Sequence, residues 1–270
     1  MPELPEVEIT RRGLEPHVVG RRLTGAVVRQ RQLRYPVPEG LADAIAGERV
    51  AALARRAKYL LAHLDSGAWL LLHLGMSGSL RVVDAGAPAQ RHDHVDLVLD
   101  DGHAVRLTDP RRFGCLLRGT GEPDSHRLLR RLGPEPLGPD FDGDHLYRAG
   151  RGRRIAVKAF LMDASVVVGV GNIYANEALY RAGIRPDRAA GQVSRARYRR
   201  LAAAVREVLG AALAAGGTTL RDFTDSSGQA GHFAVALSVY GGSVCPGCGA
   251  ALRQVRVAQR GTWFCPRCQR

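Results

Sequence analysis

The sequence contains very little lysine, although it is strongly basic. Only Lys58 and Lys158 are lysines among 39 basic residues, and the formal net charge is +13. Lysine offers a compact point charge and a pKa that burial can shift, and arginine offers neither. The two lysines are therefore either chance survivors of an arginine bias or residues with a task that arginine cannot perform. Composition alone favours neither interpretation.

The sequence also lacks long apolar runs and a leader of the secretory type. The apolar stretch over 69–74 is too short to span a bilayer, which argues against a transmembrane helix. The chain opens with prolines and glutamates, whereas a signal peptide opens with basic and then apolar residues. With 45% hydrophobic and 24% charged residues, the composition is that of a globular protein. We expect a cytoplasmic protein without membrane contact.

Acidic residues are absent from the last part of the chain, which remains rich in arginine. Clustered arginine favours a polyanionic partner, because it displaces the counterions condensed on phosphates. The segment 148–158 is a second basic stretch. The arginines of the segment 241–270 are Arg253, Arg256, Arg260, Arg267 and Arg270.

Cysteine is scarce as well, but four of the five cysteines are regularly spaced. Cys245 and Cys248 form one close pair, Cys265 and Cys268 form another, and 16 residues separate the pairs. Two such pairs suit a tetrahedral Zn²⁺, and four cysteine ligands leave no open position for catalysis. The alternative, two disulfides, is disfavoured in a cytoplasmic chain. We expect one structural Zn²⁺ that folds a segment too small for its own core, and we interpret Cys115 as a small buried residue.

The pattern changes from strands to helices near the segment 133–139, which is rich in proline and glycine. Before it, short runs bounded by turn residues predict a β-sandwich or barrel, preceded by a helix from about Glu3 to Leu14 that ends at Gly13 or before Pro16. After it, helical patterns and a polar loop over 222–232 follow. The expected strands are 26–29, 50–53, 59–64, 68–74, 80–83, 94–99 and 104–107, and the expected helices are 144–151, 155–162, 173–182 and 194–215.

The N-terminus carries a second chemical signal. Once Met1 is removed, Pro2 presents a free secondary amine that is partly neutral at physiological pH. A neutral amine can attack an electrophilic carbon and form an iminium, and Glu3 or Glu6 lies close enough in sequence to move protons. Proline also follows methionine without any catalytic role, and glutamate is favoured at helix starts, so this signal alone is weak.

Motifs spread in order along the whole chain resemble the formamidopyrimidine-DNA glycosylases, the oxidised-purine branch of the Fpg/Nei family. The start Pro-Glu-Leu-Pro-Glu favours this branch, because the pyrimidine branch usually reads Pro-Glu-Gly-Pro. One departure is His232, where many relatives have tyrosine. The motifs are Met1–Glu8, Arg55–Leu60, His73–Leu80, His92–Val95, Thr108–Gly114, Gly169–Glu177, Gly217–Phe223 and the zinc segment through Gln259–Thr262.

The resemblance implies a reaction and the residues that perform it. Pro2 would attack C1′ of the damaged nucleotide, and Glu3 would supply a proton as the base departs. Lys58 would act as a general acid in β-elimination, and Arg260 would act near the phosphate in δ-elimination. The implied enzyme is a bifunctional DNA glycosylase and AP lyase of base excision repair that removes 8-oxoguanine and formamidopyrimidines. Lys158 would lie by the lesion pocket, so both scarce lysines fall on functional positions of the family.

The resemblance also implies how DNA is held. A glycosylase takes the damaged nucleotide out of the stack, and side chains fill the space left behind. Met76 and Phe113 would wedge between bases, and Arg111 would hydrogen-bond the orphaned partner base. Asn172, at a helix start after two glycines, would bind phosphate. The other expected phosphate contacts are His73, His92, Arg112, Arg153 or Arg154, and Arg260.

The implied fold is α+β and multidomain. Residues 1–135 would form a catalytic β-sandwich with flanking helices, 136–235 a helical helix–two-turn–helix domain with a lesion loop, and 236–270 a zinc-finger β-hairpin. We expect a nucleoid-associated monomer that binds double-stranded DNA containing oxidised or abasic sites. Two alternatives remain open: an enzyme for oxidised pyrimidines, and a non-catalytic DNA-binding protein, against which Pro2, Glu3 and Lys58 argue.

Overall fold

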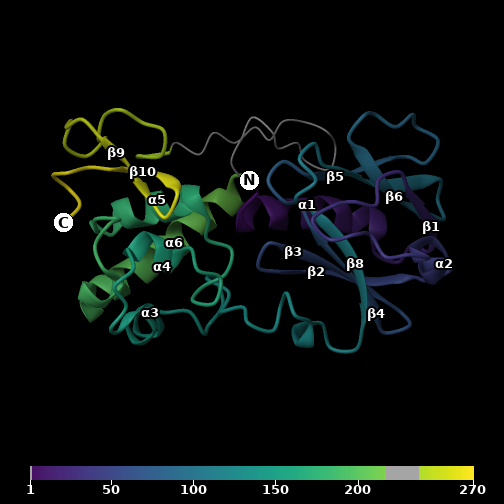
Figure 1. The fold of residues 1–270 in the computed structure, drawn as a ribbon, viewed down its shortest axis with the longest axis horizontal. Coiled ribbons are helices and arrows are strands. Elements are labelled where there is room, and N and C mark those ends of the chain that lie inside the picture. Colours follow the sequence, from purple (N-terminus) through teal and green to yellow (C-terminus); the bar gives the residue numbers. More distant parts are fainter. Residues whose placement is uncertain (1, 217–236) are drawn as a thin grey trace. The chain divides into compact units, whose positions relative to one another are not determined.

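The computed structural model describes residues 2–216 and 237–270, which fall into two compact units (Figure 1). The first unit extends to Arg130. The second begins at Arg131, continues to Ala215, and includes the chain from residue 237 onward. The polar loop expected over 222–232, with His232, and the motif 217–223 lie outside the described residues.

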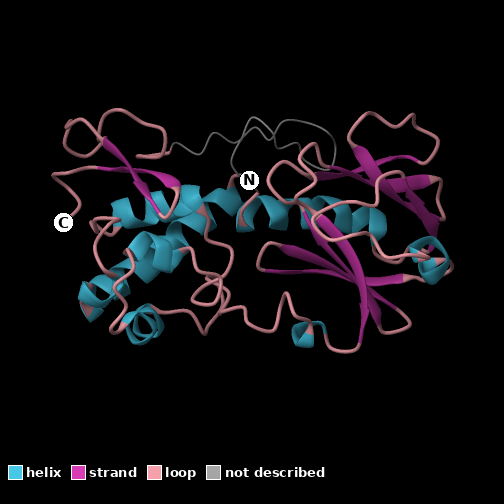
Figure 2. Ribbon diagram, viewed as in Figure 1, coloured by secondary structure: helices cyan, strands magenta, loops and turns pink. Residues whose placement is uncertain are grey.

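The first unit contains the β-sandwich that the strand pattern predicts. Its strands are β1 (Leu23–Val28), β2 (Val50–Arg56), β3 (Tyr59–Leu64), β4 (Ala68–His73), β5 (Ser79–Asp84), β6 (Asp93–Leu99), β7 (His103–Thr108) and β8 (Cys115–Thr120). One antiparallel sheet has the order β1-β6-β7-β5 and the other the order β2-β3-β4-β8. Figure 2 draws the strands in magenta. The side chains of Leu70, Leu97 and Leu107 are buried in a core that both sheets share.

Strand β8 and the short helix α2 (Leu41–Ile45) are not predicted from the sequence pattern. β8 contains Gly119, which weakens any strand signal. The glycine is nevertheless required, because a Cβ at this position would lie 2.1 Å from the ring of Trp69 on the neighbouring strand β4. Helix α2 has only five residues, too few to display a helical period.

Helix α1 (Leu4–Val18) is longer than the sequence predicts. It continues through Gly13 and includes Pro16, the two positions at which the sequence predicts its end. Pro16 has no N–H to donate to the carbonyl four residues earlier, so the helix loses one hydrogen bond in its last turn. Leu14 and Val18 are buried, and this packing carries the helix past the proline. α1 packs against β2, β3 and β5.

The second unit contains the helices and the zinc segment. Asp142 caps the first of its helices by accepting from His145 N at 2.6 Å, and Ser194 caps the last by accepting from Arg197 N at 3.4 Å. The helices are α3 (Gly143–Gly150), α4 (Val157–Leu161), α5 (Asn172–Arg181) and α6 (Arg195–Ala214), and the strands are β9 (Arg253–Val257) and β10 (Arg260–Phe264). Two 3₁₀ turns complete the described chain, η1 (Pro123–Ser125) before this unit and η2 (Ala190–Gln192) within it. Within residues 2–216 and 237–270, every helix is too short or too polar to cross a membrane.

Candidate active site and nucleic-acid interface

Pro2 and Glu3 lie at the start of helix α1, and both are buried. Glu3 is the N-cap residue, and its backbone N–H donates to the carboxylate of Glu6 at 2.8 Å. Pro5, in the first turn, has a fixed φ that suits a helix start. These contacts hold the backbone around Pro2 and Glu3 in one conformation, which a nucleophile and a proton donor require.

Lys58 lies at the tip of the β2–β3 hairpin, directly after Ala57, whose φ is +56°. This tip is connected to helix α1 through Arg55. The Arg55 guanidinium donates to Ala57 O at 2.9 Å and to the Glu8 carboxylate at 3.1 Å. Burial raises the pKa of Glu8, but hydrogen bonds from Arg11 and neighbouring arginine charges outweigh it and lower the pKa overall. The ionised Glu8 therefore joins the helix that carries Pro2 to the hairpin that carries Lys58.

His73 ends strand β4, and its ring lies 4.9 Å from the ring of Tyr59. Burial, with the positive charges of Lys58 and Arg34, lowers the pKa of His73 to about 4. The ring is therefore neutral at pH 7. Its Nδ1 accepts from the backbone N–H of Gly75 at 2.9 Å, so the proton resides on Nε2. A neutral histidine in this tautomer can donate one hydrogen bond to a phosphate oxygen.

Two loops cross side by side from one sheet of the sandwich to the other. Residues 74–78 connect β4 to β5, and residues 109–114 connect β7 to β8. Because β4 pairs with β8 and β5 with β7, the two crossovers are neighbours although 35 residues separate their starts. Gly75 has φ +65°, and a Cβ there would lie 2.5 Å from Gly114 N. The topology thus brings Met76 and the segment 111–113 to the same edge of the sandwich.

Arg111, Arg112 and Phe113 are all exposed on the second crossover. The Arg111 guanidinium lies 5.0 Å from the centre of the Phe113 ring. Between them Arg112 has φ +56°, a left-handed conformation that costs a non-glycine residue about 1–3 kcal/mol. Phe113 is 44% exposed, which is unusual for so large an apolar side chain. His92 is half-buried, and its carbonyl accepts from Asp109 N at 3.0 Å at the base of this crossover.

Lys158 is almost completely buried in the second unit, with 1% of its surface exposed. Its ammonium donates to Asn172 Oδ1 at 2.6 Å, to Gly261 O at 3.0 Å and to Thr262 Oγ1 at 2.6 Å. The amide of Asn172 also donates to Gly261 O at 3.2 Å. Three acceptors around one compact charge match an ammonium, not a planar guanidinium. Lys158 therefore joins α4, the start of α5 and strand β10.

Arg260 begins strand β10, immediately after the hairpin turn, and is exposed. The turn residues Ala258 and Gln259 both have positive φ, +48° and +62°, as a two-residue turn of the I′ type requires. The Thr262 hydroxyl donates to Arg260 O at 3.0 Å and accepts from Lys158. The backbone that carries Arg260 is thus held from the buried side.

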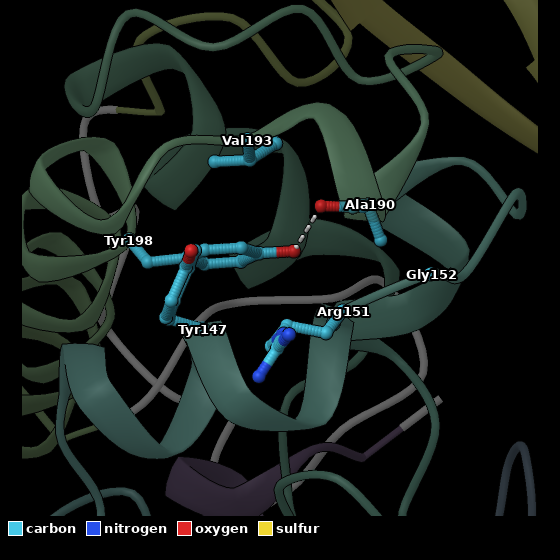
Figure 3. A pocket seen from close by; sticks show the side chains of 8 residues that line it. Tyr147, Arg151, Gly152, Ala190, Val193 and Tyr198 are labelled. Carbon is cyan, nitrogen blue, oxygen red and sulfur yellow. Dashed lines mark hydrogen bonds between the residues drawn. The ribbon is translucent and has the colours of Figure 1, made fainter.

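Arg153 and Arg154 are exposed on the loop between α3 and α4. A cavity of about 150 Å³ lies beside this loop and is lined by Tyr147, Arg151 and Tyr198 among others (Figure 3). The Tyr198 hydroxyl donates to Ala190 O at 2.8 Å, as the dashed line in Figure 3 shows. Arg153 O accepts from the N–H of Gly191, the next residue along, at 2.8 Å. The residues around the cavity therefore hold the base of the loop.

The four cysteines of the C-terminal segment converge on one point. Their Sγ atoms all lie within 4.8 Å of one another. The Cys245–Cys268 and Cys248–Cys265 pairs are separated by 3.8 and 3.5 Å, too far for a disulfide. Zn–S bonds of about 2.3 Å around a tetrahedral ion place the sulfurs roughly 3.8 Å apart. The donor set and its spacing therefore fit Zn²⁺ with all four positions filled by protein.

Two residues that position the zinc segment, Asn176 and Glu177, have no individual role in the sequence-based predictions. The buried carboxylate of Glu177, on α5, accepts the backbone N–H groups of Ser238, Val239 and Tyr240 at 2.8–2.9 Å. Asn176 accepts from Trp263 N at 2.8 Å. Both stand within the Gly169–Glu177 motif, so the motif was recognised, but the sequence does not distinguish a buried anchor from a ligand contact.

Three family models match successive parts of the chain. The formamidopyrimidine-DNA glycosylase N-terminal domain matches residues 1–116, the formamidopyrimidine-DNA glycosylase H2TH domain matches 132–224, and the zinc finger found in FPG and IleRS matches 242–270. A formamidopyrimidine-DNA glycosylase of Halorhodospira halophila is 76% identical over 270 residues, which are 100% of both chains. The chain belongs to the formamidopyrimidine-DNA glycosylase family. The family's zinc finger and the four converging cysteines establish one structural Zn²⁺.

Solved structures of formamidopyrimidine-DNA glycosylases have the same fold over the whole chain. The Lactococcus lactis Fpg in complex with DNA containing an abasic site has a TM-score of 0.91 at 32% identity, and covers 99% of each chain. A mutant of that enzyme in complex with Fapy-dG containing DNA gives the same values. The expected α+β fold, with a sandwich, an H2TH domain and a zinc hairpin, is confirmed.

Proposed function

We propose that this chain excises oxidised purines, 8-oxoguanine and formamidopyrimidines, from double-stranded DNA and then cleaves the abasic strand by β,δ-elimination. The observation that carries the proposal is the rigid, buried start of helix α1, where Pro2 and Glu3 stand together. The relatives in complex with abasic-site and Fapy-dG containing DNA support this substrate class.

In the proposed reaction the nitrogen of Pro2, freed by removal of Met1, attacks C1′ of the damaged nucleotide. The bond from C1′ to the base breaks as Glu3 donates a proton to the departing base. The C1′–O4′ bond then opens, the N–H proton of Pro2 passes to O4′, and an iminium links protein and sugar. The positive end of the α1 dipole favours a neutral over a cationic amine at this place. Lys58, whose hairpin is joined to α1 by Arg55, acts as the general acid of β-elimination, and Arg260 acts near the phosphate in δ-elimination.

The side chains on the two crossovers take the place of the extruded nucleotide. Met76 and Phe113 wedge into the stack and Arg111 pairs with the orphaned base. The Phe113 ring, which lies 5.0 Å from the Arg111 guanidinium, supports this role because 44% of its surface is exposed to solvent. The proposed phosphate contacts are His73 as a neutral donor, His92, Arg112, Arg153, Arg154, Asn172 and Arg260.

We assign Lys158 a supporting role within this interface. Its ammonium is enclosed by three protein acceptors, one of which belongs to Asn172. It therefore acts on DNA through Asn172 and the backbone next to Arg260. We further propose that residues 1–135, 136–235 and 236–270 divide the tasks of catalysis, DNA binding and zinc-supported clamping. The enzyme works as a monomer in the cytoplasm, associated with the nucleoid.

The decisive experiment is borohydride trapping on a duplex that carries 8-oxoguanine opposite cytosine. Wild-type protein is compared with Pro2→Gly and Glu3→Gln, after mass spectrometry has established loss of Met1. Pro5→Ala is the matched control, because it also replaces a buried proline of the same helix start but leaves the terminal amine intact.

The proposal requires a covalent band with wild type and Pro5→Ala that falls sharply in both other variants. A wild type that yields no band on this duplex but does on an oxidised-pyrimidine duplex would transfer the activity to the other branch of the family. No band on either duplex, with Met1 removed and zinc bound, would leave only a DNA-binding protein.

A further inference from the structure

Asp109 is a fully buried carboxylate to which neither the sequence motifs nor the proposed reaction gives a role. It follows strand β7 and opens the second crossover, with none of its surface exposed. A buried carboxylate is costly unless it accepts several hydrogen bonds. The donors that bind its two carboxylate oxygens therefore show which segments it stabilises.

The side chain of Asp109 accepts from both crossovers. Its Oδ2 accepts from Gly114 N at 2.7 Å, and its Oδ1 accepts from Arg111 N at 3.3 Å. Oδ1 also accepts from the hydroxyl of Ser77 at 3.3 Å, and Ser77 is the residue next to Met76 on the first crossover. One carboxylate thus bridges the two loops that carry Met76, Arg111 and Phe113.

The backbone of Asp109 extends this cluster to a third segment. Its N–H donates to His92 O at 3.0 Å, and its carbonyl lies 2.8 Å from His94 Nε2. The same carbonyl accepts from Arg112 N at 3.1 Å. These bonds close the tight turn in which Arg112 adopts its left-handed conformation, and that conformation places the Arg111 guanidinium over the Phe113 ring.

We propose that Asp109 is a positioning residue for base extrusion: its carboxylate fixes the two crossovers against each other so that Met76, Arg111 and Phe113 enter the duplex as one unit. This inference rests on the proposed function of those three side chains. Asp109 itself touches neither DNA nor the reacting atoms. Asparagine at this position would present an NH₂ group to N–H donors, so it would release one of the loops while nearly preserving volume.

The test separates base extrusion from chemistry. One duplex carries a tetrahydrofuran abasic analogue, which the enzyme cannot cleave, opposite 2-aminopurine, whose fluorescence rises when it is unstacked. Excision is measured on a second duplex that carries 8-oxoguanine opposite cytosine. Wild type and Pro2→Gly are compared with Asp109→Asn and with Ser77→Ala, which removes only the bond to the first crossover. Asp96→Asn is the matched control, because Asp96 is an equally buried carboxylate of the same sheet that binds Arg106 and Arg29 instead of the crossovers.

We expect Asp109→Asn to lower the fluorescence rise and the single-turnover excision of 8-oxoguanine about tenfold or more, since misplacing a side chain by an ångström can cost about a hundredfold. Ser77→Ala should lose less, and Asp96→Asn should retain wild-type amplitude at the same thermal stability as Asp109→Asn. Pro2→Gly should keep the fluorescence rise while losing excision.

The outcomes distinguish this inference from the proposed function. If wild type itself gives no fluorescence rise, the proposed insertion of Met76, Arg111 and Phe113 is wrong, and the inference about Asp109 is wrong with it. If wild type gives the rise and Asp109→Asn equals it, or Asp96→Asn loses as much at equal stability, Asp109 has only a structural role. If Asp109→Asn does not fold, Ser77→Ala decides. A fluorescence rise with Ser77→Ala that equals the rise with wild type overturns the proposal.

Discussion

Replacing Lys158 tests whether this position needs lysine for a physical reason. Lys158→Met keeps the length of the side chain and removes the ammonium, so Asn172 Oδ1, Gly261 O and Thr262 Oγ1 all lose a charged donor. Lys158→Arg keeps the charge but brings a larger, planar group into a site with 1% exposure. If three acceptors around a compact charge explain why this position is lysine, both variants must destabilise the contacts that Lys158 makes with the start of α5 and with β10.

The size of the effect follows from the contacts. A hydrogen bond to a charged group contributes about 1.5–3 kcal/mol, which gives a gross loss of about 4–9 kcal/mol for the three bonds. Removing the buried ammonium also removes its desolvation cost of several kcal/mol. Gly261 O keeps its bond from Asn172, at 3.2 Å. We therefore expect Lys158→Met to lower the free energy of unfolding of the second unit by about 2–4 kcal/mol.

The two tryptophans allow a local assay, because Trp263 lies on β10 and Trp69 in the first unit. In a Trp69→Phe background, the urea unfolding curve followed by Trp263 emission reports the hairpin. Both Lys158 variants should unfold at lower urea than the parent. Lys58→Met, at the other lysine, should leave this transition in place. If Lys158→Arg unfolds at the same urea concentration as the parent, the reasoning is refuted, because any cation would then satisfy the three acceptors.

Three further predictions concern zinc, backbone packing and pH. Chelation of Zn²⁺ should shift Trp263 emission and weaken binding to duplex DNA, and added Zn²⁺ should restore both. Gly75→Ala should lower the free energy of unfolding by about 1–3 kcal/mol, because its Cβ would lie 2.5 Å from Gly114 N, whereas Gly86→Ala meets open space and should be neutral. The pKa of His73 is lowered to about 4 in the folded protein, so the unfolded chain binds a proton that the native state does not. Stability should therefore fall as pH drops from about 6.5 towards 4, by up to about 2 kcal/mol at pH 5, and His73→Gln should remove this part of the pH dependence in urea titrations.

The elements that carry strong local patterns could be predicted from the sequence. β3 and β4 read as strands because their apolar runs are bounded by the turn at Asp65–Gly67, and the structure contains them within one residue of the expected bounds. Long-range packing determined the exceptions. Helix α1 passes Pro16 because Leu14 and Val18 are buried beyond it, and β8 tolerates Gly119 because Trp69 fills the space beside it.

The candidate site was predictable where chemistry dictates residue type and spacing. Four cysteines in two close pairs indicate zinc in any fold, and the structure brings their sulfurs together. Arg55 and Glu8, by contrast, stand within the motifs Arg55–Leu60 and Met1–Glu8, but the sequence gives neither of them a role. Their bond between the Lys58 hairpin and helix α1 depends on two elements that are separated by 47 positions. A single sequence does not reveal such a pairing, because each glutamate could pair with any of many arginines.

Buried charges connect segments of the chain in ways that the sequence does not reveal. Lys158, Asp109 and Glu177 are all at most 3% exposed, and each binds groups of a segment far from it in the sequence. A charge of this kind tolerates no misplacement, because an unsatisfied partner in a dry site costs about 1–3 kcal/mol. Lys158 and Asp109 therefore fix segments that carry the proposed DNA contacts, and Glu177 fixes the chain before the zinc segment. In the proposed interface the exposed residues supply the charge, and the buried charges beneath them determine its shape.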